Sequence, residues 1–176
     1  GFDGRGYQSC LAASQDLIHW QPRGLVLSYG AKGAFDFGGV TLTAPLYESY
    51  DILKVPRLKL WQGVYWSLYG SYPQQGGYEL GAGSQGLAWS RDGISWHRSS
   101  DSLPVLSPAG GAPWEDRVVY APYLLEHNGL FWNFYNAKGR SGREQIGIAT
   151  SKDLRHWERF GGNPVIRNRD SLSDAL

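Results

Sequence analysis

The heptapeptide "SKDLRHW" (Ser151–Trp157) is the third copy of a pattern that decides the fold of this chain. "SQDLIHW" (Ser14–Trp20) and "SRDGISW" (Ser90–Trp96) repeat the same spacing of Ser, Asp and Trp. Each copy follows a short run of small and apolar residues that predicts a strand, and the Trp opens the next strand. An Asp at this place can accept hydrogen bonds from backbone N–H groups, as in an Asx-turn. We therefore expect three equivalent strand–turn–strand units in which the Asp is structural.

A second repeat lies between these turns. "VPRLKLWQGVYWSLYG" (Val55–Gly70) aligns without gaps with "APYLLEHNGLFWNFYN" (Ala121–Asn136), and the two share Pro, Leu, Gly, Trp and Tyr. Each copy has a Gln-Gly or Asn-Gly dipeptide at its centre, and Asn-Gly is a strong signal for a two-residue hairpin. The residues after the dipeptide alternate as in a strand, and no segment has a convincing helical period. Each copy predicts a β-hairpin.

Hairpin, strand, turn and strand together make a four-stranded antiparallel unit. Such units in series predict an all-β chain with a β-propeller fold. The expected contents are a half blade at about 1–28 and full blades at about 35–105 and 114–165. A β-sandwich is the alternative, although it would not need this repeat. Two and a half blades per chain make a partial propeller, because they cannot close a ring.

Composition excludes several classes of protein. A length of 176 residues fits one domain. The net charge of +1 predicts no surface for nucleic acid or an anionic membrane, and no apolar run is long enough to span a bilayer. Cys10 is the single cysteine, so an internal disulfide and a Cys-based zinc cluster are excluded. The chain has no Met and begins at Gly1, so we expect that this is not the natural start. The cellular compartment stays open.

Several motifs resemble the five-bladed β-propeller glycoside hydrolases of the family 43-like and family 32-like groups. They are "FDFGGV", "YESYD", "PRLKL", "GGYEL", "GLAWSRDGISW", "WEDRVVYAPYL", "FYNAKGRSGREQIGIATSKDLRHW" and "NPVIRN". The resemblance covers nearly the whole chain and implies a funnel-shaped pocket in which carboxylates cleave a glycosidic bond. It also implies that about half of a complete propeller is absent. No cofactor is expected, although a central ion would be compatible with the family.

Glycoside hydrolysis needs a carboxylic acid and a second carboxylate as base or nucleophile. In a propeller, the loops between blades and the loops between the second and third strands open around the central channel. The candidate catalytic residues in these loops are Asp36, Glu48, Asp51, Glu115 and Asp116. Asp51 and Asp116 stand at nearly the same distance before the repeated hairpin. We therefore expect them to face one cavity, although "WEDR" departs from the acid motif of family 43 proper.

Other polar and aromatic residues are candidates for binding a sugar. Guanidinium and amide donors suit sugar hydroxyls or the carboxylate of an acidic sugar, and tyrosine rings can stack on a sugar ring. The candidates are Arg57, Tyr72, Tyr78, Asn136, Lys138, Arg143 and Glu144. A charged surface loop is the competing interpretation for the "NAKGRSGRE" segment. His residues show no metal-ligand spacing, and no metal site is predicted.

Three interpretations of function stay open. The first is a glycosidase acting on a poly- or oligosaccharide. The second is a carbohydrate-binding or assembly module without turnover, and the third is a protein-interaction propeller. Fold analogy alone does not choose among them. Because unpaired strand edges invite association, we also expect a homodimer that completes the propeller.

Overall fold

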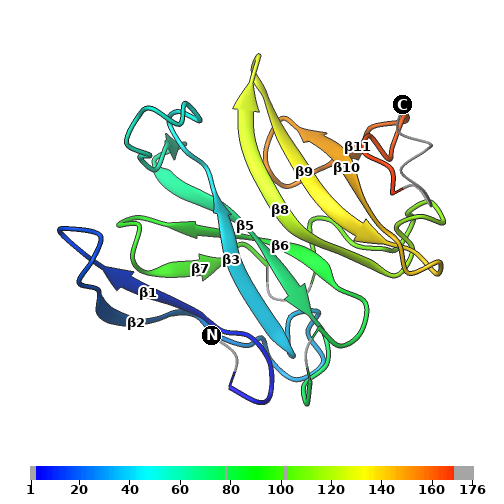
Figure 1. The fold of residues 1–176 in the computed structure, drawn as a ribbon, viewed down its shortest axis with the longest axis horizontal. Helices are drawn as coiled ribbons and strands as arrows, with labels where there is room; N and C mark the ends of the chain where they lie inside the picture. Colours follow the sequence, from blue (N-terminus) through cyan, green and yellow to red (C-terminus); the bar gives the residue numbers. More distant parts are fainter. Residues whose placement is uncertain (1–2, 78, 101–102, 169–176) are drawn as a thin grey trace.

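The computed structural model describes residues 3–77, 79–100 and 103–168. Within them lie eleven strands in three antiparallel sheets and no helix, so the all-β prediction is confirmed (Figure 1). Sheet I pairs β1 (Ser9–Ala13) with β2 (Gln21–Leu27). Sheet II contains β3 (Gly39–Pro45), β4 (Leu60–Trp61), β5 (Val64–Tyr72), β6 (Ser84–Ser90) and β7 (Trp96–Arg98). Sheet III contains β8 (Val118–His127), β9 (Leu130–Lys138), β10 (Glu144–Ser151) and β11 (Glu158–Arg159).

Sheets II and III are built alike. The strand orders are β3-β5-β6-β7 and β8-β9-β10-β11, with each strand antiparallel to its neighbours. Sheet I has two strands, and β1 and β2 correspond to the last two strands of the other sheets. In Figure 1 the three sheets lie side by side in chain order, with sheet I at the left and sheet III at the right. This architecture is that of a partial β-propeller.

The two repeated hairpins turn at the predicted Gln-Gly and Asn-Gly dipeptides. Gln62-Gly63 and Asn128-Gly129 all have positive φ, and each dipeptide links two paired strands (β4–β5 and β8–β9). Such φ values match the right-handed twist of the strands, which is why Gly is favoured there.

The first strand of sheet II differs from the prediction. It is β3, at Gly39–Pro45, and residues 46–59 form an intervening segment before the short β4. The strand expected within 55–61 is therefore reduced to Leu60–Trp61. In sheet III the corresponding strand β8 is continuous.

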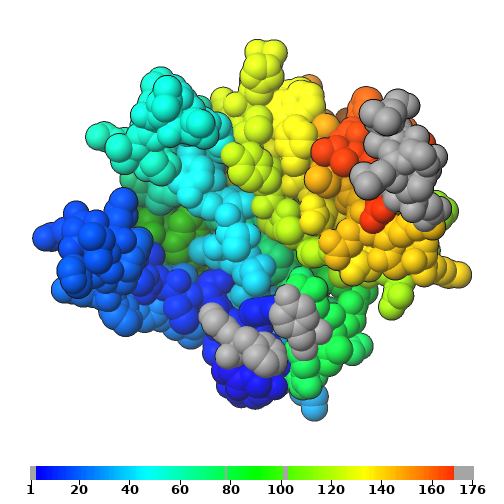
Figure 2. Space-filling model, in the orientation of Figure 1, coloured from blue at the N-terminus to red at the C-terminus, as the bar shows by residue number. Residues whose placement is uncertain are grey.

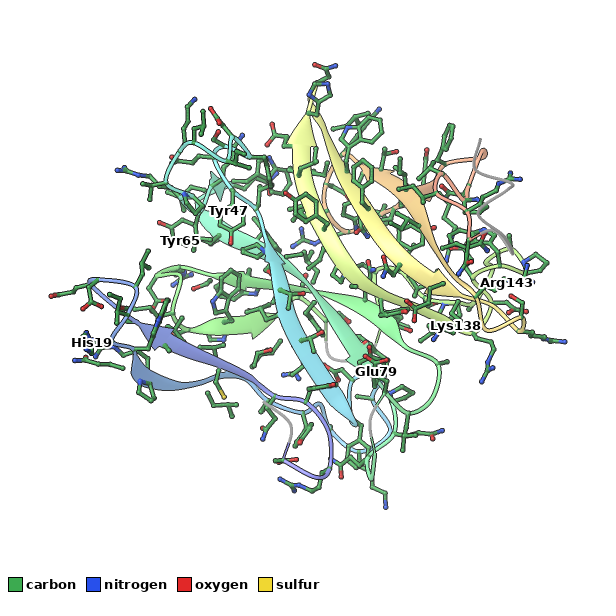
Figure 3. All side chains as sticks on the ribbon, viewed as in Figure 1. His19, Tyr47, Tyr65, Glu79, Lys138 and Arg143 are labelled. Carbon is green, nitrogen blue, oxygen red and sulfur yellow. The ribbon has the colours of Figure 1, made fainter. Side chains whose placement is uncertain are left out.

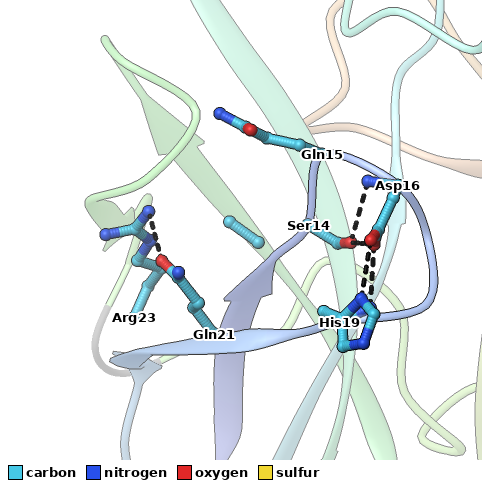
Figure 4. Close-up of a pocket in the computed structure, with 7 residues that line it drawn as sticks. Ser14, Gln15, Asp16, His19, Gln21 and Arg23 are labelled. Atoms are coloured by element: carbon cyan, nitrogen blue, oxygen red, sulfur yellow. Dashed lines mark hydrogen bonds and ion pairs between the residues drawn. The ribbon is translucent and has the colours of Figure 1, made fainter.

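The Ser-x-Asp turns are held by their own side chains. Asp153 Oδ1 accepts hydrogen bonds from the backbone N–H groups of Arg155 (2.9 Å) and His156 (2.8 Å). Asp92 accepts equivalent bonds, and Asp16 lies in the same arrangement with Ser14 and His19 beside a hollow of about 270 Å³ (Figure 4). The predicted capping role is confirmed in all three turns.

Asp153→Ala is expected to lower the free energy of unfolding by about 1 kcal/mol at pH 7, because two backbone donors lose their acceptor. Hydrogen bonds from His156 hold the pKa of the Asp153 carboxyl well below its ordinary value. A lowered folded-state pKa stabilises the fold above the unfolded-state value of about 3.9. The stability difference between parent and variant should therefore shrink as pH falls below about 4. Urea unfolding at both pH values measures it. Lys152→Ala, in the same turn and exposed, is the control and should match the parent.

The core lies between the sheets. Leu68 and Leu87 of sheet II pack with Leu124, Phe131 and Leu154 of sheet III in one buried cluster. A second cluster joins Leu27, at the end of β2, to Val40 and Tyr69 of sheet II. Burial of these apolar faces fixes each sheet against the next one. Among the described residues, no helix has the length and hydropathy that crossing a membrane requires.

Candidate functional site

Two edges of sheets II and III must be distinguished. The near edge is where β3 and β8 begin, β5 and β9 end, and β6 and β10 begin. The far edge carries the hairpin turns and the Ser-x-Asp turns. Figure 3 shows Glu79, Lys138 and Arg143 toward the near edge, and Tyr47 and Tyr65 toward the far edge.

A tyrosine, a carboxylate and an ammonium group meet at the near edge of sheet III. Lys138, at the end of β9, lies opposite Glu144 in the strand register, and their side chains form an ion pair of 2.9 Å. The nearby hydroxyl of Tyr120 on β8 is the main influence that holds the pKa of the Glu144 carboxyl below its ordinary value, and the ion pair with Lys138 adds to it. Glu144 is therefore a charged acceptor at neutral pH, with the Lys138 ammonium group beside it.

A second tyrosine–carboxylate pair lies at the near edge of sheet II. Tyr72, the last residue of β5, is 4% exposed, and burial is the main cause that raises the pKa of its hydroxyl. Glu79 adds to this rise through its charge and a hydrogen bond, and Tyr120 contributes through its charge. Tyr72 also packs against Tyr7, with ring centroids 6.4 Å apart. Two pairs, Tyr72–Glu79 and Tyr120–Glu144, are thus neighbours at one edge.

A hollow of about 300 Å³ opens beside the second pair. It is lined by Asn136 and Glu144, both predicted sugar-binding residues, and by Gln145, Ile146, Ile166, Arg167 and Asn168. Its size is at the lower end of the range for small-molecule sites, and its lining combines amide, carboxylate and guanidinium groups with two isoleucines. The accessible surface of the hollow is mainly apolar, and its polar side chains supply donors and acceptors suited to hydroxyl groups.

The other predicted residues of the near edge are peripheral to this hollow. Asp116 Oδ2 lies 3.4 Å from Arg140 Nε, in an ion pair whose guanidinium is largely exposed. The backbone N–H of Arg143 donates to the hydroxyl of Ser141. Tyr78 lies outside the described residues.

Asp36 and Glu115 occupy equivalent buried positions beneath the near edge. Each stands three residues before its sheet's first strand. The Asp36 carboxylate accepts hydrogen bonds from the Tyr69 hydroxyl (3.2 Å) and from Arg98 Nε (2.6 Å). Glu115 accepts a bond from the Tyr135 hydroxyl (2.8 Å), and its Oε1 lies 3.1 Å from Arg159 Nε.

The two carboxylates are almost fully enclosed. Asp36 is 0% exposed and Glu115 is 1% exposed. Both carboxylate–tyrosine–arginine groups recur at matching places in sheets II and III, and each arginine also donates to a backbone carbonyl of the preceding loop (Ser28 or Ser107). The arrangement joins the outermost strand of each sheet to the loop that enters it.

The remaining three candidates lie in the segment between β3 and β4. Glu48, Asp51 and Arg57 are exposed, and Asp51 pairs with Lys54 at 3.8 Å. Since this segment follows β3, whereas Asp116 precedes β8, the structure does not bring Asp51 and Asp116 together. Residues 46–59 (teal) and the loop before β8 lie at opposite edges in Figure 1. Asp51 and Asp116 stand at similar distances before the repeated hairpin only because residues 46–59 are inserted between β3 and β4. The two residues are therefore not structurally equivalent.

Sequence reasoning did not single out Glu79 or Tyr120. Both stand in quoted motifs, "GGYEL" and "WEDRVVYAPYL", and both flank strand ends that face the near edge. A search for tyrosines and carboxylates at matching strand ends of both sheets would have found them. Among the described residues, no three His, Cys, Asp or Glu side chains gather as metal ligands would.

Comparison with known proteins supports the fold. No family model matches the chain, and no match is found among curated proteins. A structure described as "Glycoside hydrolase" superposes with a TM-score of 0.83 at 28% identity, covering 95% of this chain and 52% of that chain. A complex of BT0996 and RGII superposes with a TM-score of 0.81 at 26% identity, covering 95% of this chain and 51% of that chain.

A third structure is Zg3597, a family 117 glycoside hydrolase of Zobellia galactanivorans. Its TM-score is 0.70 at 18% identity, covering 93% of this chain and 44% of that chain, so it bears on the fold alone. The chain spans about half the length of the solved structures it matches. Its fold is that of the propeller glycoside hydrolases, and the expected resemblance is confirmed.

Proposed function

We propose that this chain supplies part of a carbohydrate-binding mouth in a glycoside hydrolase-like propeller. The observation that carries the proposal is the cluster of Tyr120, Glu144 and Lys138 beside the hollow at the near edge. A charged carboxylate paired with an ammonium group, next to an amide and a tyrosine hydroxyl, presents the acceptors and donors that sugar hydroxyls require.

The electrostatics favour binding over acid catalysis for Glu144. A general acid in glycoside hydrolysis needs a raised pKa, whereas Tyr120 and Lys138 lower the pKa of Glu144. Glu144 suits the role of a hydroxyl acceptor or of the base in a catalytic pair. Hydrolysis by this mouth would need a protonated carboxyl in addition. We propose Glu79 as the second carboxylate of the mouth, since it adjoins Tyr72 beside Tyr120.

The alternative is a module that binds carbohydrate without turnover. The burial of Asp36 and Glu115 in ion pairs favours it, because two of the five candidate catalytic carboxylates are enclosed. Release of reducing ends from a panel of plant and microbial polysaccharides separates the two functions. Turnover that is lost in Glu79→Gln supports the enzyme, and binding without turnover supports the module.

Glu144→Gln is expected to weaken binding of an oligosaccharide identified in that panel by about tenfold, because a hydrogen bond to a charged group contributes about 1.5–3 kcal/mol. Isothermal titration calorimetry measures the effect. Glu158→Gln is the matched control, since Glu158 is an exposed carboxylate that begins β11, after the far-edge turn. Equal affinities of the Glu144 and Glu158 variants would contradict the proposed site.

A further inference from the structure

The first strand of sheet III is docked on sheet II by a backbone hydrogen bond that the fold repeats. On the face shown in Figure 2, the cyan surface of β3 adjoins the yellow-green surface of β8. The Val119 N–H of β8 donates to the Gly83 carbonyl (2.9 Å), as the Val40 N–H of β3 donates to the Tyr7 carbonyl (2.9 Å). This bond belongs to the architecture, and it fixes where β8 begins.

The course of β8 changes directly after Tyr120. The register between β8 and β9 shifts between Tyr120 and Tyr123, which makes a bulge. Ala121 has a φ of 45°, a backbone conformation that residues with a side chain adopt at a cost. A bulge bends its strand and changes the direction of the neighbouring side chains. The groups that hold this part of the backbone therefore determine where the Tyr120 ring lies.

Two buried amide side chains hold the backbone at this bulge. Gln85 Nε2, on β6 of sheet II, donates to the Tyr120 carbonyl (3.3 Å). Asn133 Nδ2, on β9 of sheet III, donates to Gln85 Oε1 (2.6 Å). Both side chains belong to residues that are 0% exposed. Because the Gln85 amide has one acceptor end and one donor end, the bond from Asn133 turns its donor end toward Tyr120. We call this Asn133–Gln85–Tyr120 connection the amide relay.

The repeated architecture does not itself require the amide relay. Ser67 stands at the place of Asn133 in sheet II, two residues before the repeated tyrosine of the second strand. Ile146 stands at the place of Gln85 in sheet III, one residue before the glycine opposite that tyrosine. Asn133 Oδ1 also has no hydrogen-bond partner among the described residues, a cost that an apolar pair would avoid. These differences point to a role other than holding the sheets together.

We propose that Gln85 and Asn133 are positioning residues for the near-edge site, which hold the β8 bulge so that the Tyr120 hydroxyl lies beside Glu144. Both amides are enclosed between the sheets, so they act on a bound ligand through Tyr120. The influence of the Tyr120 hydroxyl on the pKa of Glu144 supports this placement. The inference rests on the proposed function, because the placement matters for binding only if carbohydrate binds at the near edge.

Packing at the start of β6 gives the direction in which Tyr120 would move without the amide relay. A Cβ placed on Gly83 would stand 2.5 Å from Val118 Cγ2 and 3.1 Å from Tyr72 Cε1, closer than such atoms normally come. The Val118 side chain and the Tyr72 ring thus pack directly on the Gly83 backbone. Since β8 cannot approach sheet II more closely here, loss of the amide relay lets the bulge move away from sheet II.

An NMR titration of Glu144 measures the placement of Tyr120 without any ligand. The test variant is Gln85→Met/Asn133→Leu, which nearly keeps the shape of both side chains and removes both amides. The Tyr120 hydroxyl holds the pKa of Glu144 low, so this pKa should rise toward its ordinary value in the variant. The Lys138 ammonium group is present in both proteins. An unchanged pKa of Glu144 in the folded variant would overturn the proposal.

Ser67→Ala is the matched control for that variant. Ser67 is 0% exposed, and its hydroxyl donates to the Leu68 carbonyl (2.9 Å) at the place that Asn133 holds in sheet III. The substitution removes a buried hydrogen bond that does not involve Tyr120, so the pKa of Glu144 should stay at the parent value. An equal rise of this pKa in the control would mean a general loosening of the sheets and would refute a positioning role.

A double-mutant cycle shows whether the amide relay acts through Tyr120. Tyr120→Phe removes the hydroxyl and should by itself raise the pKa of Glu144. Gln85→Met should raise the same pKa in the parent protein, which also provides a test if the double variant does not fold. Combined with Tyr120→Phe, it should cause no further rise. Additive rises would contradict action through Tyr120.

Calorimetry with an oligosaccharide that binds the parent protein separates this inference from the proposed function. The affinity should fall in Gln85→Met/Asn133→Leu by about the same factor as in Tyr120→Phe. Full affinity in the first variant, with a clear loss in the second, would overturn the positioning role. A raised pKa of Glu144 together with no carbohydrate binding by the parent would support the amide relay and contradict the proposed function alone.

Discussion

Asp36→Asn is expected to lower the free energy of unfolding by about 3–5 kcal/mol, because it leaves the Arg98 guanidinium without its buried counter-charge. The Asp36 side chain is 0% exposed and that of Arg98 is 15% exposed, so water cannot replace the lost partner. Asparagine keeps nearly the same volume, which separates the charge effect from a cavity effect. Urea unfolding followed by tryptophan fluorescence measures the change.

Asp51→Asn is the matched control for that variant. Asp51 pairs with Lys54 at 3.8 Å, and the two side chains are 44% and 68% exposed. Exposed ion pairs contribute about 0–1 kcal/mol, so this variant should remain close to the parent. If both variants unfold at the same urea concentration, the Asp36–Arg98 pair does not stabilise the fold as its geometry indicates. Lost turnover in a fully stable Asp36 variant would return Asp36 to the catalytic candidates.

The second large effect is expected for Leu154→Ala. Leu154 is 0% exposed in the cluster between sheets II and III, and removal of a buried leucine side chain costs about 2–5 kcal/mol. Leu17→Ala at the equivalent place should change stability by less than about 0.5 kcal/mol, because Leu17 is 76% exposed. Both residues have positive φ, 65° and 62°, so the backbone contribution is matched.

Thermal and urea unfolding of these two variants checks the comparison. A large loss of stability for Leu17→Ala would mean that Leu17 is covered in solution, contrary to its exposure in the structure.

Two kinds of carboxylate look alike in the sequence but differ in the structure. One kind is enclosed in buried ion pairs, and the other lies at the near edge. "WEDR" places Glu115 and Asp116 side by side, but the backbone turns Glu115 inward to Arg159 and leaves Asp116 beside an exposed Arg140. Glu144, at the end of a segment that reads as an ordinary charged loop, pairs with Lys138 and lines a hollow. Charge alone therefore did not separate the enclosed carboxylates from the one that lines the hollow.

Local interactions could be predicted from the sequence. The Ser-x-Asp turns close within four residues, since Asp92 accepts from Ile94 and Ser95, and the hairpin dipeptides adopt the positive φ that their residue types favour. Repetition of these local elements also determined the all-β fold, because each copy carries the same strand and turn pattern. The likeness to propeller glycoside hydrolases follows from the same motifs.

Tertiary structure decided what depends on residues far apart in the chain. Arg98 meets Asp36 from 62 positions away, and no local pattern shows that this carboxylate is paired and enclosed. The choice of Gly39–Pro45 as the first strand of sheet II rests on pairing with β5, and it carries Asp51 to the far edge. The sequence by itself thus determined the turns, the hairpins and the repeated sheet. Long-range pairing and burial decided which carboxylates stabilise the fold and which remain at the surface, because those energies depend on neighbours that only the folded chain brings together.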